Sequence, residues 1–146
     1  MQKLPHHYSV SAWSATDGHV ELTSEGLTSI ESAAPAEFGG PGDRWSPETL
    51  LVAAVADCFI LTFKAIARAS KLDWVSLSCS VDGVLDRVEG ATRFTEFTLH
   101  VKLEPAPGTD EQKALRLLEK SEQSCLITKS LNGSTVLHAE IKKPNQ

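Results

Sequence analysis

The sequence predicts an α+β fold in which the strands pair mainly in the antiparallel sense. Hydrophobic residues alternate in the first thirty residues and again over much of the second half, while a long segment between them has helical periodicity. The predicted order is three strands, a long helix, two strands, two helices and a closing strand. With 146 residues, the chain is long enough for one core and too short for two ordinary domains, so we expect residues 1–146 to form a single domain.

Three short strands are predicted near the N-terminus, at residues 8–13, 20–23 and 27–30. The Asp-Gly pair at 17–18 is typical of a tight hairpin turn between the first two. Residues 32–46 contain three glycines and two prolines, so we expect a loop there.

The strongest helix signal begins at Ser46 and continues to about Ser70. Serine is a favoured N-cap, Pro47 suits the first helical position, and Glu48 suits the positive end of the helix dipole. The helix is apolar nearly all round, which predicts a central helix or one that another subunit covers. Its inward face is predicted from spacings of three and four to contain Leu51, Ala54, Val55, Cys58, Leu61, Thr62 and Ala65.

The remaining elements follow from a change of period and from capping residues. Alternation predicts strands at 75–88 and 94–103, and the Thr-Asp pair at 109–110 caps the next helix. A short helix is predicted to begin at Cys125, and residues 135–141 form the closing strand.

Composition excludes several classes of partner and compartment. The net charge of −5 argues against nucleic acid and against anionic membranes. No uninterrupted apolar run reaches the length of a membrane span, and the N-terminus lacks the apolar stretch of a secretory signal. Three cysteines are an odd number for a disulfide framework. We therefore expect a cytoplasmic protein that does not bind a membrane.

The three cysteines have different environments. Cys79 alternates with polar residues on the inward face of a strand, which favours an inert core role. Cys58 lies in the middle of the long helix, where it is either core or a reactive thiol. Cys125 stands in the first turn of a short helix, where the dipole favours a thiolate, or it is a partly buried spacer. The histidines show no metal-ligand spacing with the cysteines, so we expect no metal site.

Two segments resemble the osmotically inducible protein C / organic hydroperoxide resistance (OsmC/Ohr) family. In Ser46-Pro-Glu-Thr-Leu-Leu-Val-Ala-Ala-Val-Ala-Asp-Cys58, a Pro-Glu pair precedes a helix of small residues and a cysteine follows the glutamate by ten positions. The segment Ser124-Cys-Leu-Ile-Thr-Lys-Ser-Leu131 is similar to the family's second cysteine motif. The order of elements also agrees along nearly the whole chain.

The resemblance implies an intertwined homodimer in which sheets wrap around long central helices. It also implies a peroxidase in which Cys58 attacks an organic hydroperoxide and becomes a sulfenic acid. Cys125 then forms a disulfide with Cys58, and an external thiol or lipoyl-type dithiol reduces that disulfide without a bound cofactor. An apolar pocket would favour organic peroxides, and its predicted lining is Ala54, Phe59, Leu61 and Phe63.

The family also uses an Arg–Glu ion pair beside the reactive cysteine. Glu48 matches the glutamate, but neither the turn at 16–19 nor Glu37, which precedes Phe38, supplies the arginine. Arg44 is the nearest substitute, unless it is an exposed loop residue paired with Asp43. Ten helical residues separate Glu48 from Cys58 by roughly 15 Å, so we expect a composite site in which each subunit's Glu48 serves the other's Cys58.

Two other functions are compatible with the residues. A non-catalytic dimer that binds an apolar ligand in its interface fits the missing arginine and the apolar helix. A cysteine hydrolase or acyl transferase with Cys58 as nucleophile would need a base, and no histidine follows in a recognisable arrangement.

Overall fold

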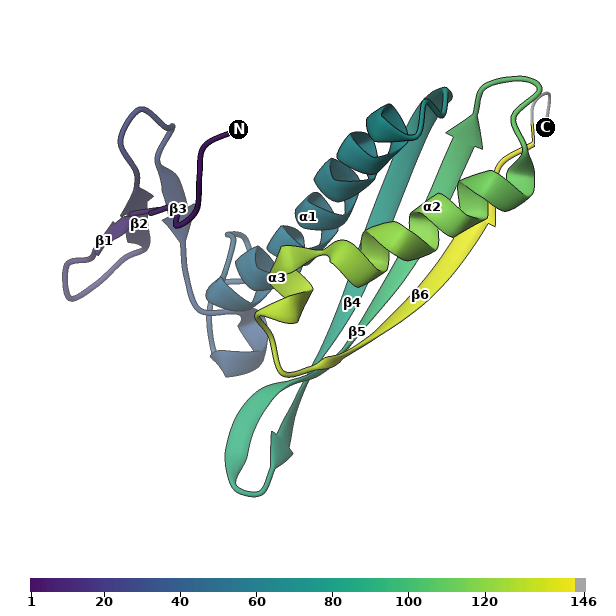
Figure 1. Cartoon of the computed structure of the whole chain (residues 1–146). Coiled ribbons are helices and arrows are strands. Elements are labelled where there is room, and N and C mark those ends of the chain that lie inside the picture. Colours follow the sequence, from purple (N-terminus) through teal and green to yellow (C-terminus); the bar gives the residue numbers. More distant parts are fainter. Residues whose placement is uncertain (144–146) are drawn as a thin grey trace. The chain divides into compact units, whose positions relative to one another are not determined.

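A computed structural model describes residues 1–143, and its elements follow the predicted order (Figure 1). Contacts divide the chain into an N-terminal unit, Met1–Leu51, and a C-terminal unit that begins at Val52. The expectation that residues 1–146 form a single domain stays a prediction beside this division. The expected loop at 32–46 contains one short element, the 3-10 helix η1 (Ala36–Phe38).

The N-terminal unit contains a three-stranded antiparallel sheet in the order β1-β2-β3. Its strands are β1 (Ser11–Trp13), β2 (Val20–Thr23) and β3 (Ile30–Ser32). The third strand begins where the sequence analysis expected it to end, because the residues before it belong to the turn around Gly26 (φ 78°). Glycine adopts this left-handed conformation without steric cost, so the turn consumes residues that the alternation had assigned to the strand.

The start of helix α1 (Pro47–Ala69) is fixed by a reciprocal capping arrangement, which confirms the predicted N-cap. The Thr49 amide donates to Ser46 Oγ at 3.1 Å, and the Ser46 amide donates to Thr49 Oγ1 at 2.8 Å. Both bonds satisfy backbone donors at the helix N-terminus. The cap therefore defines where α1 begins.

The buried stripe of α1 differs from the predicted inward face. The residues that are fully buried in this chain follow a spacing of four: Val55, Phe59, Phe63 and Ala67. Only Val55 belongs to the predicted set. Phe59 and Phe63, which were expected to line a pocket, are core residues with 0% exposure, whereas Leu61 is 57% exposed. A helix that is apolar on every side offers no polar face from which the buried side can be deduced.

Helix α1 is also long and apolar enough to cross a membrane, with a mean hydropathy of 2.1, although the sequence analysis found no span. Its fully buried stripe packs within a folded unit, and Asp57, Lys64 and Arg68 interrupt its apolar surface.

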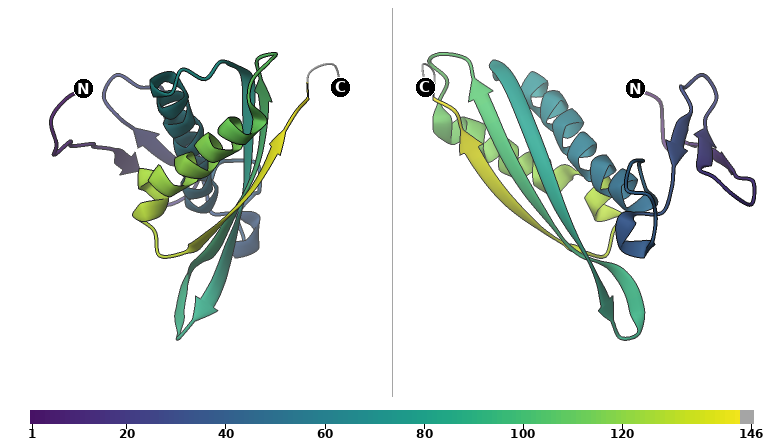
Figure 2. Two further views of the ribbon diagram at one scale, coloured as in Figure 1. Left: turned by 45° about the vertical axis from the view of Figure 1, so that its right-hand side comes forward. Right: turned by 180° about the vertical axis from the view of Figure 1, so that it is seen from behind.

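The C-terminal unit is a sheet in the order β4-β5-β6, covered on one face by helices (Figures 1 and 2). The long strands β4 (Trp74–Val88) and β5 (Ala91–Pro105) form an antiparallel hairpin. Strand β6 (Ser134–Ile141) runs parallel to β5, whereas the other strand pairs of the described residues are antiparallel, as the predicted mainly antiparallel pairing requires. Helices α2 (Glu111–Ser124) and α3 (Leu126–Lys129) lie between them in sequence and form the crossover that parallel pairing requires.

The core of this unit lies between the sheet and the helices. Figures 1 and 2 show α1 and α2 on the same face of the sheet. Alternate residues of β5 are buried there, as the period of two predicts: Phe97, Leu99, Val101 and Leu103. Helix α2 begins at the predicted cap, Asp110, whose carboxylate accepts a hydrogen bond from the Gln112 amide at 3.0 Å. Its last residue, Ser124, directly precedes Cys125.

Candidate functional site

The fold of the C-terminal unit brings two of the three cysteines into contact. Cys58 lies in the middle of α1, and Cys125 occupies the single residue between α2 and α3. The Cys125 thiol lies close enough to Cys58 to help lower the pKa of the Cys58 thiol, and both thiols are free. Cys125 is buried, with 1% exposure, whereas Cys58 is partly exposed. An external reagent therefore meets Cys58 first, with Cys125 behind it.

The surroundings of Cys58 favour its thiolate. Burial raises the pKa of this thiol, but hydrogen bonds to the sulfur more than compensate and the pKa is lowered. The donors are the backbone amide of Ile127, the Cys125 thiol, the hydroxyl of Thr62 and the amide of Leu126. The two amides come from the first turn of α3, where N–H groups have no partner within the helix.

Cys125 differs from Cys58 in this respect. The sequence left a thiolate and a partly buried spacer as alternatives for Cys125. Burial raises its pKa and the adjacent Cys58 raises it further, despite a hydrogen bond from the Thr128 backbone, which favours the spacer. The amides of Leu126 and Ile127 lower the pKa of Cys58, and only the amide of Thr128 acts on Cys125 in the same sense. The pair therefore consists of an ionisable Cys58 and a Cys125 that keeps its proton.

Cys79 has the environment of a core residue. It lies on β4 opposite Val101 of β5, and it is partly buried. Burial and the nearby charge of Cys125 raise its pKa to about 11. The Cys79 thiol is therefore protonated near neutral pH and is a poor nucleophile there.

The other two predicted site residues, Glu48 and Arg44, belong to the N-terminal unit. Among the residues that the structure describes, Glu48 Oε1 is buried without a hydrogen-bond partner. Arg44 Nη1 donates to Glu31 Oε2 at 2.8 Å, and His19 Nε2 lies 3.4 Å from Glu31 Oε1. The alternative of a pair with Asp43 is thus replaced by a pair with Glu31. Buried carboxylate oxygens normally accept a hydrogen bond, so a donor for Glu48 Oε1 is expected from outside the described residues of this chain.

Sequence reasoning missed three kinds of contact at these residues. Glu31 orients Arg44 from a strand, and no local pattern joins the two residues. The amides of Leu126 and Ile127 reach Cys58 only through the tertiary fold. The spacing of Thr62, four residues after Cys58 on a helix, was a usable signal, because such residues share one face.

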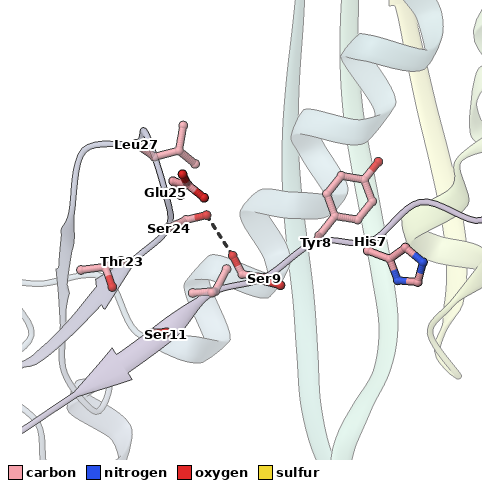
Figure 3. A pocket seen from close by; sticks show the side chains of 9 residues that line it. His7, Tyr8, Ser9, Ser11, Thr23, Ser24, Glu25 and Leu27 are labelled. Atoms are coloured by element: carbon pink, nitrogen blue, oxygen red, sulfur yellow. Dashed lines mark hydrogen bonds between the residues drawn. The ribbon is translucent and has the colours of Figure 1, made fainter. Parts of the chain in front are cut away.

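A surface pocket of the N-terminal unit has a different character (Figure 3). It lies between the segment before β1 and the turn that joins β2 to β3, where Ser24 Oγ donates to the Ser9 carbonyl at 2.9 Å. Its lining consists of His7, Tyr8, Ser9, Val10, Ser11, Thr23, Ser24, Glu25 and Leu27. The lining contains no cysteine, so this pocket is separate from the candidate thiol site at Cys58 and Cys125.

The thiol environments predict an order of alkylation. Iodoacetamide at neutral pH is expected to modify Cys58 first, because its lowered pKa provides the largest thiolate fraction. The pH at which alkylation of Cys58 reaches half of its maximal rate should be lower than for an ordinary thiol. For Cys79 this midpoint should lie near pH 11. Peptide mass spectrometry over a pH series measures both. Faster labelling of Cys79 than of Cys58 would contradict the assignment.

Comparison with known proteins relates this architecture to characterised folds. The family model described as OsmC-like protein matches residues 40–140, which include both thiols. An organic hydroperoxide resistance protein of Xanthomonas axonopodis pv. citri is 31% identical over 118 residues, which cover 77% of this chain and 78% of that protein. An uncharacterized protein of Bacillus subtilis is 27% identical over 140 residues, covering 92% of this chain and 93% of its own length.

A solved structure supports the fold assignment. An OsmC-like protein of unknown function from Vibrio cholerae superposes with a TM-score of 0.84 at 18% identity, over 92% of this chain and 99% of that one. At this identity the likeness shows the fold alone.

Proposed function

This chain belongs to the OsmC-like protein family, and on that premise we propose that it is a thiol-dependent peroxidase that reduces organic hydroperoxides to alcohols. The observation that supports the proposal most strongly is the contact between the two thiols. A partly exposed Cys58 with a lowered pKa lies against a buried Cys125 whose pKa is raised. A nucleophilic thiol and a protonated partner are what a two-cysteine peroxidase needs.

The proposed reaction proceeds in three balanced steps. The Cys58 thiolate attacks the terminal oxygen of the hydroperoxide, the O–O bond breaks, and the alkoxide leaves as the alcohol after taking up a proton. The resulting sulfenic acid condenses with the Cys125 thiol, which forms the disulfide and releases water. An external dithiol, such as a lipoyl-type group, then exchanges with the disulfide, so that both cysteines are reduced and the dithiol is oxidised.

We further propose a homodimer with composite sites. Leu61 on α1 is 57% exposed, and Leu51, Val52 and Ile60 are only partly covered within this chain. A second copy would remove this apolar surface from water. It would also bring Glu48, about 15 Å along the helix from Cys58, beside the partner's thiol. Glu31 holds Arg44 at 2.8 Å, which makes Arg44 the candidate cation for the developing alkoxide.

Mixing two inactive variants tests the composite site. Cys58→Ser leaves Glu48 intact, and Glu48→Gln leaves Cys58 intact, so a mixed dimer contains one complete site. After subunit exchange, the mixture should recover about a quarter of wild-type activity, since half of the dimers are mixed and each has one working site. The control mixture pairs Cys58→Ser with the Cys58→Ser/Glu48→Gln double variant. Activity no higher than in that control would place Glu48 and Cys58 outside a shared intersubunit site.

A second candidate is a dimer that keeps the fold and binds an apolar ligand without catalysis. The donors to Cys58 within the C-terminal unit are two amides, a hydroxyl and a thiol, all of them uncharged. This favours the second candidate, because none of them supplies the positive charge that the family's arginine gives to the reactive cysteine. Consumption of cumene hydroperoxide in the presence of a dithiol distinguishes the two candidates. The peroxidase consumes many equivalents of it, and prefers it to hydrogen peroxide, whereas a binding protein consumes none. We place this activity in the cytoplasm, where cysteines remain reduced between turnovers.

A further inference from the structure

The side-chain hydroxyl that contacts Cys58 belongs to its own helix. Thr62 Oγ1 lies 3.8 Å from Cys58 Sγ, in a partly buried position one helical turn further along α1. Residues four apart on a helix share one face, so α1 by itself makes Cys58 and Thr62 neighbours. This proximity depends neither on the N-terminal unit nor on a second subunit.

The orientation of this hydroxyl is unlike that of other helical hydroxyls in the chain. Serine and threonine inside helices commonly bond to the carbonyl four residues earlier. Ser121 does so, with Oγ 2.7 Å from the Leu117 carbonyl, and the C-cap Ser130 that follows α3 has Oγ 2.9 Å from the Leu126 carbonyl. Thr62 instead directs its hydroxyl to sulfur. Because a thiolate has no proton to give, the Thr62 hydroxyl must be the donor once Cys58 is ionised.

We propose that Thr62 is a catalytic residue whose hydroxyl stabilises the Cys58 thiolate and fixes the direction of its attacking lone pair. A hydrogen bond to a charged group is about twice as strong as one between neutral groups, so the hydroxyl favours the thiolate over the thiol. The donor is held on the same rigid helix as the nucleophile, and no rearrangement is needed when the thiol ionises.

This inference rests on the proposed role of Cys58 as a nucleophile, but its effect appears before any peroxide is added. The experiment therefore measures the ionisation of Cys58 through the pH dependence of its alkylation by iodoacetamide, in the full-length protein. Thr62→Val removes the hydroxyl and keeps the shape of the side chain. Thr62→Ser restores a hydroxyl, and Thr98→Val removes an exposed strand hydroxyl that donates to Glu96 Oε1 at 3.2 Å.

In Thr62→Val the pKa of Cys58 is expected to rise by about one unit, which reduces the alkylation rate at low pH about tenfold. The plateau rate at high pH should not change, because the fully ionised sulfur remains accessible. Thr62→Ser should return most of the shift, and Thr98→Val should show none. A merely structural disturbance would also lower the plateau rate of alkylation, and Thr62→Ser would not restore that rate.

Two results would overturn the inference. One is a wild-type pH profile in Thr62→Val, and the other is a changed plateau that Thr62→Ser does not restore. Failure of the peroxidase proposal has a different signature, because hydroperoxide would then survive in every variant while the pH profiles could still differ.

Discussion

Replacing Cys58 with serine is expected to lower kcat/KM for cumene hydroperoxide by roughly a thousandfold or more. A serine hydroxyl remains protonated at neutral pH and cannot form a sulfenic acid, so the step that breaks the O–O bond is lost. The hydrogen-bond donors around the position remain in place, which keeps the substitution from altering the fold. A coupled assay that follows oxidation of a dithiol measures the rate.

Cys79→Ser is the matched control for that substitution. Cys79 is partly buried on β4, and its pKa of about 11 keeps it protonated near neutral pH. Its removal should leave kcat/KM within about twofold of wild type, because a protonated thiol contributes little nucleophile. The assignment of the nucleophile to Cys58 would be wrong if Cys58→Ser kept more than a tenth of wild-type activity. It would also be wrong if Cys79→Ser had no activity.

Replacing Cys125 with serine should separate the first turnover from the later ones. The serine hydroxyl can still donate to Cys58, so the first equivalent of hydroperoxide should be consumed at nearly the wild-type rate. No disulfide can follow, and Cys58 should stop as a sulfenic acid that excess peroxide converts to sulfinic acid. Stopped-flow measurement of the burst, followed by mass analysis of Cys58, tests both parts.

Cys125→Ala adds a comparison that depends on the hydrogen bond between the thiols. Alanine removes the donor to Cys58 that helps to lower its pKa, so the burst should also become slower at neutral pH. Sustained turnover by either variant at the wild-type rate would mean that Cys125 does not resolve the sulfenic acid.

The elements of this fold were largely predictable because their signals are local. The Ser46 cap, the Asp110 cap and the alternation along β5 each lie within a few residues and have the predicted structure. The parallel pairing of β6 with β5 was not predicted, since it depends on where the α2–α3 crossover returns the chain. The predicted inward face of α1 was wrong because a helix that is apolar all round has several equivalent faces.

The proximity of two of the predicted site residues follows from the tertiary fold, while their catalytic roles stay predictions. The sequence singled out Cys58 and Cys125, and the fold places their thiols in contact. The position of Cys125 beside a helix start left a thiolate and a partly buried spacer as alternatives, because the sequence shows which residue precedes α3 but not which sulfur its amides face. The pairing of Arg44 with Glu31 likewise joins a loop to a strand and has no local signature.

The central claim is that a hydroperoxide oxidises Cys58 and that Cys125 then forms a disulfide with it. The most direct test is the intact mass of the protein before and after one equivalent of cumene hydroperoxide, followed by peptide mapping. The account predicts the loss of the mass of two hydrogens, with a Cys58–Cys125 disulfide and a reduced Cys79. All three thiols remaining reduced, while a control peroxidase reacts under the same conditions, would contradict it and favour the ligand-binding dimer.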